Sequence, residues 1–209
     1  GSVSLSSGKA STGSSGAVSI ATGSAAAGSS GGVEVSVGSS SDSNGGNVRV
    51  TAGVGSTKGG SVSIEGGEGS VGGSVQLMAG IGTQATGGAV TLTSGSSATG
   101  ASGKISIQTA NGGASGSVLL QTGLAQAAES GNMYIQAGKS IGKGGSVTVS
   151  SGASQSANGG DLRIEGGASQ TDNGGSLNLM SGSSEISKSG DNTIASGSGA
   201  TSGSIQIST

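Results

Sequence analysis

One short motif, repeated fifteen times, runs through the whole sequence. Each copy opens on Gly and carries an aliphatic residue at its third and fifth positions, Asn192 being the one exception. The eighth position is Gly in thirteen of the fourteen complete copies, and Ala110 replaces it in the other. The copies begin at Gly1, Gly16, Gly31, Gly46, Gly60, Gly73, Gly88, Gly103, Gly116, Gly131, Gly145, Gly160, Gly175, Gly190 and Gly203, so successive starts are 13, 14 or 15 residues apart. Such a period predicts a repeat architecture in which neighbouring units pack together.

The alternation within each copy is typical of a β-strand. The residues on either side of each aliphatic position are mostly Ser, Thr, Gln, Asn or charged. Successive strand side chains point to opposite faces, so the pattern predicts a half-buried strand in each copy, and no helical period is present. We expect the aliphatic side chains to form the core, represented by Val3, Leu5, Val18, Ile20, Val75, Leu77, Ile105, Ile107, Val147, Val149, Leu177 and Leu179.

Small residues mark the ends of the expected strands. The residue before each opening Gly is Gly or Ser at all fourteen junctions. Asn44, Asn111, Asn158 and Asn173 each precede Gly-Gly, which favours a left-handed turn. These glycines are therefore predicted to form corners between strands, namely Gly16, Gly46, Gly60, Gly88, Gly145, Gly160 and Gly175. The competing interpretation, a disordered Gly/Ser-rich segment, fits the composition but not the register of the aliphatic residues.

The fold class predicted from these features is all-β, a parallel β-solenoid without helices. One copy offers a single apolar strand, so two copies are needed for two aliphatic faces to meet. This gives about seven coils of two strands, with about 30 residues in each coil. The second position of odd-numbered copies is always small, which predicts a close-packing face at Ser2, Ser61, Ala89, Ser117, Ser146 and Ser176. A coil of one copy, and an antiparallel meander with an apolar face that needs a partner, remain open alternatives.

The domain organisation expected is a single repeat domain over residues 1–209, forming part of a longer array. No capping segment precedes Val3 or follows Ile207. Open strand edges invite pairing, so we expect end-to-end stacking with copies of this chain or with the rest of a longer repeat chain.

The amino-acid composition argues against catalysis, metal binding and nucleic-acid binding. With no His and no Cys, the chain lacks the usual groups for acid-base, nucleophilic and metal catalysis, so no enzyme activity, metal or cofactor is expected. The net charge of −2 and the absence of Phe and Trp argue against a nucleic-acid partner. No apolar run reaches the length of about 20 residues that a membrane helix needs.

Three local patterns are candidate sites for a polysaccharide or cation, for calcium and for ice. Asp161, Arg163 and Glu165 alternate along one copy, which fits a polysaccharide or cation contact but fits exposed ion pairs better. Acidic residues such as Asp42 and Asp172 are too sporadic for a calcium-binding β-roll. Thr91 and Thr93 form one Thr-x-Thr of the kind that could order water on an ice-binding face, but neighbouring copies do not continue it. The many Ser and Thr residues leave O-linked glycan open as well.

The copies GSVSLSSG, GAVSIATG and GGSVTVSSG resemble the Gly/Ser-rich repeats of large secreted or cell-surface proteins in diatoms, oomycetes and their relatives. The resemblance spans the chain, but the motif is simple. It implies an extracellular or cell-surface location and a structural role in a filament, surface appendage or wall matrix. The alternative is a surface-binding module, an adhesin or an ice-binding protein, with a flat Ser/Thr face.

Overall fold

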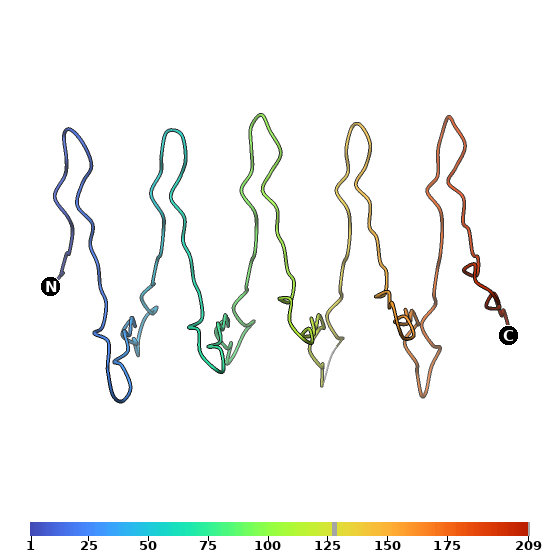
Figure 1. The fold of residues 1–209 in the computed structure, drawn as a ribbon, viewed down its shortest axis with the longest axis horizontal. Coiled ribbons are helices and arrows are strands. Elements are labelled where there is room, and N and C mark those ends of the chain that lie inside the picture. The colour runs from blue at the N-terminus through green and yellow to red at the C-terminus, as the bar shows by residue number, and fades with distance from the viewer. Residues whose placement is uncertain (127–128, 209) are drawn as a thin grey trace. The chain divides into compact units, whose positions relative to one another are not determined.

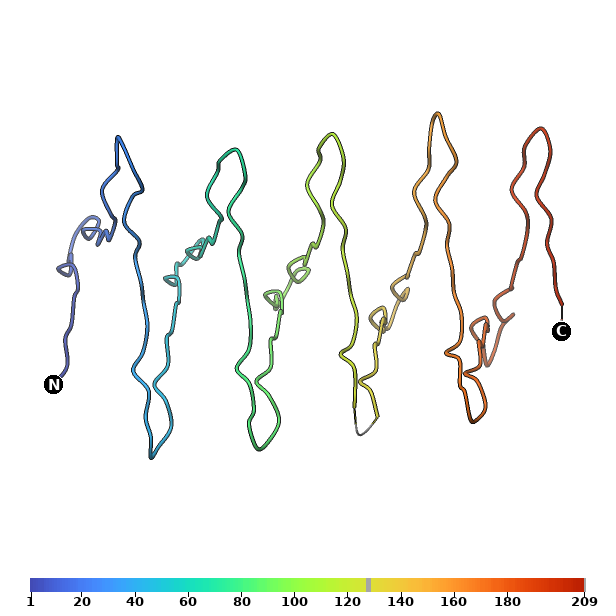
Figure 2. The same ribbon diagram turned by 90° about the horizontal axis from the view of Figure 1, so that it is seen from below.

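The computed structural model describes residues 1–126 and 129–208, and these residues form neither an α-helix nor a β-strand. The backbone instead alternates between extended segments and loops (Figures 1 and 2). The extended segments carry the aliphatic positions, and a bend recurs in the connecting stretches, for example at residues 11–13, 26–28 and 41–43. In the part of the chain that the structure describes, no helix is long and apolar enough to cross a membrane.

The chain divides into two units, Gly1–Ile107 and Gln108–Thr209. In the first unit, loops are closed by hydrogen bonds between Gly53 and Gly60, Gly67 and Gly73, Gly80 and Gly88, and Gly95 and Gly103. In the second unit, the pairs are Gly138 and Gly145, Gly152 and Gly160, Gly167 and Gly175, and Gly182 and Gly190. Each unit is thus built locally in the same way.

The closing hydrogen bond follows one rule in all eight of these loops. The backbone N–H of a copy's opening Gly donates to the carbonyl of the eighth-position Gly in the preceding copy, over 2.8 to 3.3 Å. The two ends of the loop are thereby held together, as in an Ω-loop. Figure 1 shows the backbone reversing direction at such loops, with its two arms drawn close at the base. We call this base, formed by the opening Gly of one copy and the seventh and eighth residues of the preceding copy, the neck.

Side-chain volume explains the glycine at some positions of the necks. A Cβ atom built on Gly46 would lie 2.6 Å from Cγ1 of Val37, the seventh residue of the preceding copy. A Cβ on Gly145 would lie 3.1 Å from Cβ of Ala137. At the neck where the seventh residue is Gly66, a Cβ on that residue would overlap the carbonyl oxygen of Gly73. Close approach of the facing residue, by its side chain at Gly46 and Gly145 and by its backbone at Gly66, is therefore the physical reason for these three glycines.

Backbone angles play a smaller part than the sequence predicted. Positive φ occurs at Gly13 and Gly28, with values of 82° and 95°, and at no other residue of the described ranges. The predicted corner glycines lie at or beside necks but do not adopt left-handed angles. The left-handed turns favoured at Asn44, Asn111, Asn158 and Asn173 are likewise not observed.

The prediction of a parallel β-solenoid is wrong. The described residues contain no strand that could form a ladder, and none of them is buried. The expected facing sheets, the coil of about 30 residues and the core around residues such as Val75 and Leu77 are therefore absent, as is the regular sheet that an antiparallel meander would require. The expectation of one domain over residues 1–209 stays a prediction.

The exposed area shows how far the chain is from a folded monomer. It totals 20732 Å² for a mass of 18.9 kDa. A folded monomer of this mass exposes about 8,300 Å² and an unfolded chain about 27,000 Å². Two aliphatic side chains per copy supply too little apolar surface, since ordering the backbone costs about 1–2 kcal/mol per residue. The repeat thus has local regularity without a core of its own.

The neck at Gly66 gives a direct test of the loop geometry. We expect Gly66→Ala to open this neck, because the added Cβ has no room beside the backbone of Gly73. Protection of the Gly73 amide, which donates to Gly67 over 2.9 Å, should then fall to that of an unstructured amide in hydrogen exchange. Gly67→Ala is the matched control, because no atom lies within 4 Å of its added Cβ. Equal protection of Gly73 in both variants would contradict the steric explanation.

Candidate functional site

The most regular surface feature of the chain is the pair of aliphatic side chains in each copy, at the third and fifth positions, which we call the aliphatic pair. From the second copy onward the third-position aliphatic is about half exposed, between 46% at Ile105 and 58% at Val33. The fifth-position residue is more exposed, from 60% at Ile164 to 90% at Ile207. The third-position side chain is therefore partly covered by nearby chain, whereas the fifth is open to solvent.

Polar side chains bond to each other along the segments. Arg49 Nε donates to Thr51 Oγ1 over 3.1 Å, and Ser63 Oγ donates to Glu65 Oε1 over 2.7 Å. Each bond joins the fourth and sixth positions of a copy. Residues two apart share a side in an extended backbone, so these polar side chains lie opposite the aliphatic pair. Each of these two segments thus has one apolar and one polar side.

Of Asp161, Arg163 and Glu165, the charged residues that the sequence singled out, two form an exposed ion pair. The Arg163 guanidinium contacts the Glu165 carboxylate, with side-chain exposures of 81% and 63%. A second ion pair joins Lys188 Nζ to Asp191 Oδ2 over 3.0 Å. Exposed pairs of this kind contribute about 0 to 1 kcal/mol each. Within the two described ranges, no three His, Cys, Asp or Glu side chains come together as a metal site.

The predicted packing face does not stand out as a separate surface. Ser2, Ser61, Ala89, Ser117, Ser146 and Ser176 are all exposed, each directly after an opening Gly. The predicted corner glycines, by contrast, lie close to the seventh or eighth residue of the preceding copy, within 4 Å of the position that an added Cβ would take. The structure thus places these glycines at necks and the aliphatic residues on the open segments between necks.

The seventh position is a structural position that the sequence analysis missed. It is Gly, Ala, Ser, Thr or Val in all fourteen complete copies. Ala52, Ser94, Thr109 and Ala137 occupy it and are among the few described residues that are half-buried. The uniformly small size was the available signal, and it reflects the close approach of the next opening Gly.

The tenth position was also missed, and it stabilises the bend in five loops. Ser97, Ser140, Ser154, Ser169 and Ser184 each accept a hydrogen bond from a backbone N–H two or three residues later, over 2.9 to 3.1 Å. A Ser hydroxyl that bonds nearby backbone in this way is a common turn former. The loops are therefore built by short-range interactions.

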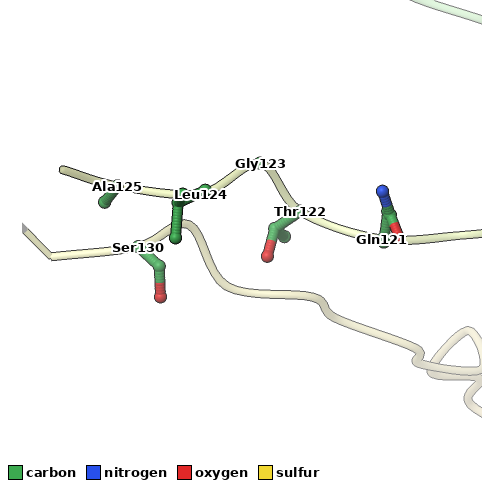
Figure 3. Close-up of a pocket in the computed structure, with 6 residues that line it drawn as sticks. All are labelled: Gln121, Thr122, Gly123, Leu124, Ala125 and Ser130. Carbon is green, nitrogen blue, oxygen red and sulfur yellow. The ribbon is translucent and has the colours of Figure 1, made fainter.

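The described residues line hollows, of which two are considered in turn. The larger, of about 640 Å³, is an open depression lined by Gln121, Thr122, Gly123, Leu124, Ala125 and Ser130. Figure 3 shows Leu124 pointing toward the stretch that carries Ser130. The smaller, of about 270 Å³, is lined by Leu179, Asn192, Thr193 and Ile194 from two consecutive segments. Neither lining includes an ionisable side chain, so the aliphatic pairs remain the candidate functional surface.

No family model matches this sequence, and neither a curated protein nor a solved structure matches it.

Proposed function

We propose that this chain is a structural repeat protein of an extracellular filament, surface appendage or wall matrix. Its aliphatic pairs would be covered by further copies of the chain or by the rest of a longer repeat chain. The observation that carries the proposal is the exposure of these pairs. Resemblance of the copies to Gly/Ser-rich repeats of secreted and surface proteins supports the extracellular setting.

Energetics favours assembly over a solitary chain. Covering a Val, Leu or Ile side chain fully contributes about 1.5–3 kcal/mol, and nearly every copy offers two such side chains. Low charge helps, because few ionised groups would lose water when copies pack: Lys, Arg, Asp and Glu make up 9% of the sequence. The small residues at the necks let loops remain closed while the segments between them are covered.

The surface-binding alternative finds less support. An ice-binding plane needs Thr side chains held in a flat, regular rank. Thr91 and Thr93 lie on a segment that belongs to no strand in the described structure.

Charge placed on the aliphatic pairs should block assembly. We expect Val75→Asp combined with Val147→Asp to raise the critical concentration at least about 100-fold, because each carboxylate would be buried without a partner. The matched control is Gln76→Asp with Thr148→Asp, which adds the same charge at adjacent positions on the opposite side of the segments. Sedimentation of the chain over a concentration series measures both. Equal effects of the two variants would argue against the aliphatic pairs as the interface.

Trypsin should distinguish loops from segments in the assembled material. Lys9, Lys58, Lys139, Lys143 and Lys188 lie in loops, whereas Arg49, Lys104 and Arg163 lie on the segments. On assembly we expect the segment sites to be cleaved at least about 10-fold more slowly, with loop sites still cut, because the segments become covered. Mass spectrometry of each bond in dilute and assembled samples gives the ratio. Uniform protection of both classes, or protection of neither, would contradict packing through the segments.

A further inference from the structure

The strongest irregularity in the repeat is a single polar residue on the aliphatic side. Asn192 stands at the third position of the fourteenth copy, where every other copy has an aliphatic residue. It lines the hollow of about 270 Å³ together with Leu179, Thr193 and Ile194. The neck between these two segments is closed by the Gly190 N–H, which donates to the Gly182 carbonyl over 2.9 Å. An amide is thus set beside aliphatic side chains at a locally defined place.

The occupant that best fits the aliphatic pairs is another copy of this chain. Their starts recur every 13 to 15 residues, and a neighbour with the same spacing can match them over the whole length. The area to be covered also exceeds what a simple dimer covers. The chain exposes 20732 Å² against about 8,300 Å² for a folded monomer, whereas a standard interface covers about 800 Å² on each partner. One chain therefore has room for several neighbouring copies to pack side by side.

A chain of near-identical units faces a register problem when it packs on itself. If a neighbour shifts by one or two copies, most aliphatic pairs still meet aliphatic pairs, although the spacings of 13 to 15 residues no longer match throughout. The aliphatic pairs of nearly all copies look alike, so these residues by themselves do not distinguish one register from another. Asn192 differs from all of them.

We infer that Asn192 sets the register in which copies of this chain pack together, an inference that rests on the proposed assembly. In the matched register the Asn192 amides of neighbouring copies meet and hydrogen-bond to each other. In a shifted register each amide would be covered by an aliphatic side chain and left without a partner. A single buried Asn fixes the register of coiled coils for the same reason.

The size of the effect follows from the cost of an unpaired buried amide. That cost lowers the population of each shifted register by on the order of tenfold to a hundredfold relative to the matched register. The charge beside Asn192 does not oppose the pairing, because Asp191 is already held by Lys188 over 3.0 Å. Removal of the amide should therefore leave assembly intact but allow several registers.

The absence of native Cys allows a clean spin-label test. A Ser183→Cys parent carries one label in an exposed loop, and distances between labels on neighbouring copies are measured in spin-diluted assemblies. We expect one narrow distance distribution in the parent. Adding Asn192→Val should spread it over several peaks separated by whole copies. Adding Thr148→Val instead should leave the distribution narrow, because Thr148, at the fourth position of its copy, lies on the opposite side of its segment from the aliphatic pair and away from the hollow.

A relocated amide provides the decisive control. Adding Val90→Asn to the Asn192→Val background should restore a single narrow distribution, since a unique polar residue at another third position again marks one register. An unchanged narrow distribution in Asn192→Val, or no restoration by Val90→Asn, would overturn the inference while leaving assembly standing. If the parent shows no dipolar coupling between copies, the proposed function itself fails, and the inference fails with it.

Discussion

The constraint on which the rest depends is the amount of apolar surface that one copy of the repeat can supply. In the sixth copy, Val75 and Leu77 are the aliphatic pair, and these two side chains remain 58% and 80% exposed. Ordering some fourteen backbone residues costs more than covering two such side chains returns. None of the residues that the structure describes is buried, so the aliphatic side of each segment is left exposed.

Short-range interactions nevertheless give the chain a definite local form. The Gly60 N–H reaches the Gly53 carbonyl over 2.9 Å, and Ala52 packs at the same neck. Ser154 accepts from the Ala157 N–H over 2.9 Å in a later loop. These interactions need no core, because the partners lie within a few residues of each other. The loops are therefore closed within the chain itself, and the aliphatic sides of the segments between them are left exposed.

The sequence predicted the positions of the segments and loops, but not their arrangement in space. The two-residue alternation located the aliphatic residues, and the glycine spacing located the chain reversals at necks such as Gly53 and Gly60. The predicted solenoid was wrong because the alternation of aliphatic and polar residues indicates which side chains share a side of the segment. It does not indicate what covers that side. The small seventh residue and the Ser at the tenth position could have been recognised from their size and chemistry. The hollow beside Asn192 depends on the path of two segments and could not.

Whether the solitary chain has a cooperative core is tested most directly by scanning calorimetry at a concentration where the chain sediments as a monomer. We expect no heat-absorption peak in this sample. A cooperative peak that is independent of concentration, with an enthalpy near the roughly 150 kcal/mol expected for 209 residues of folded protein, would contradict it.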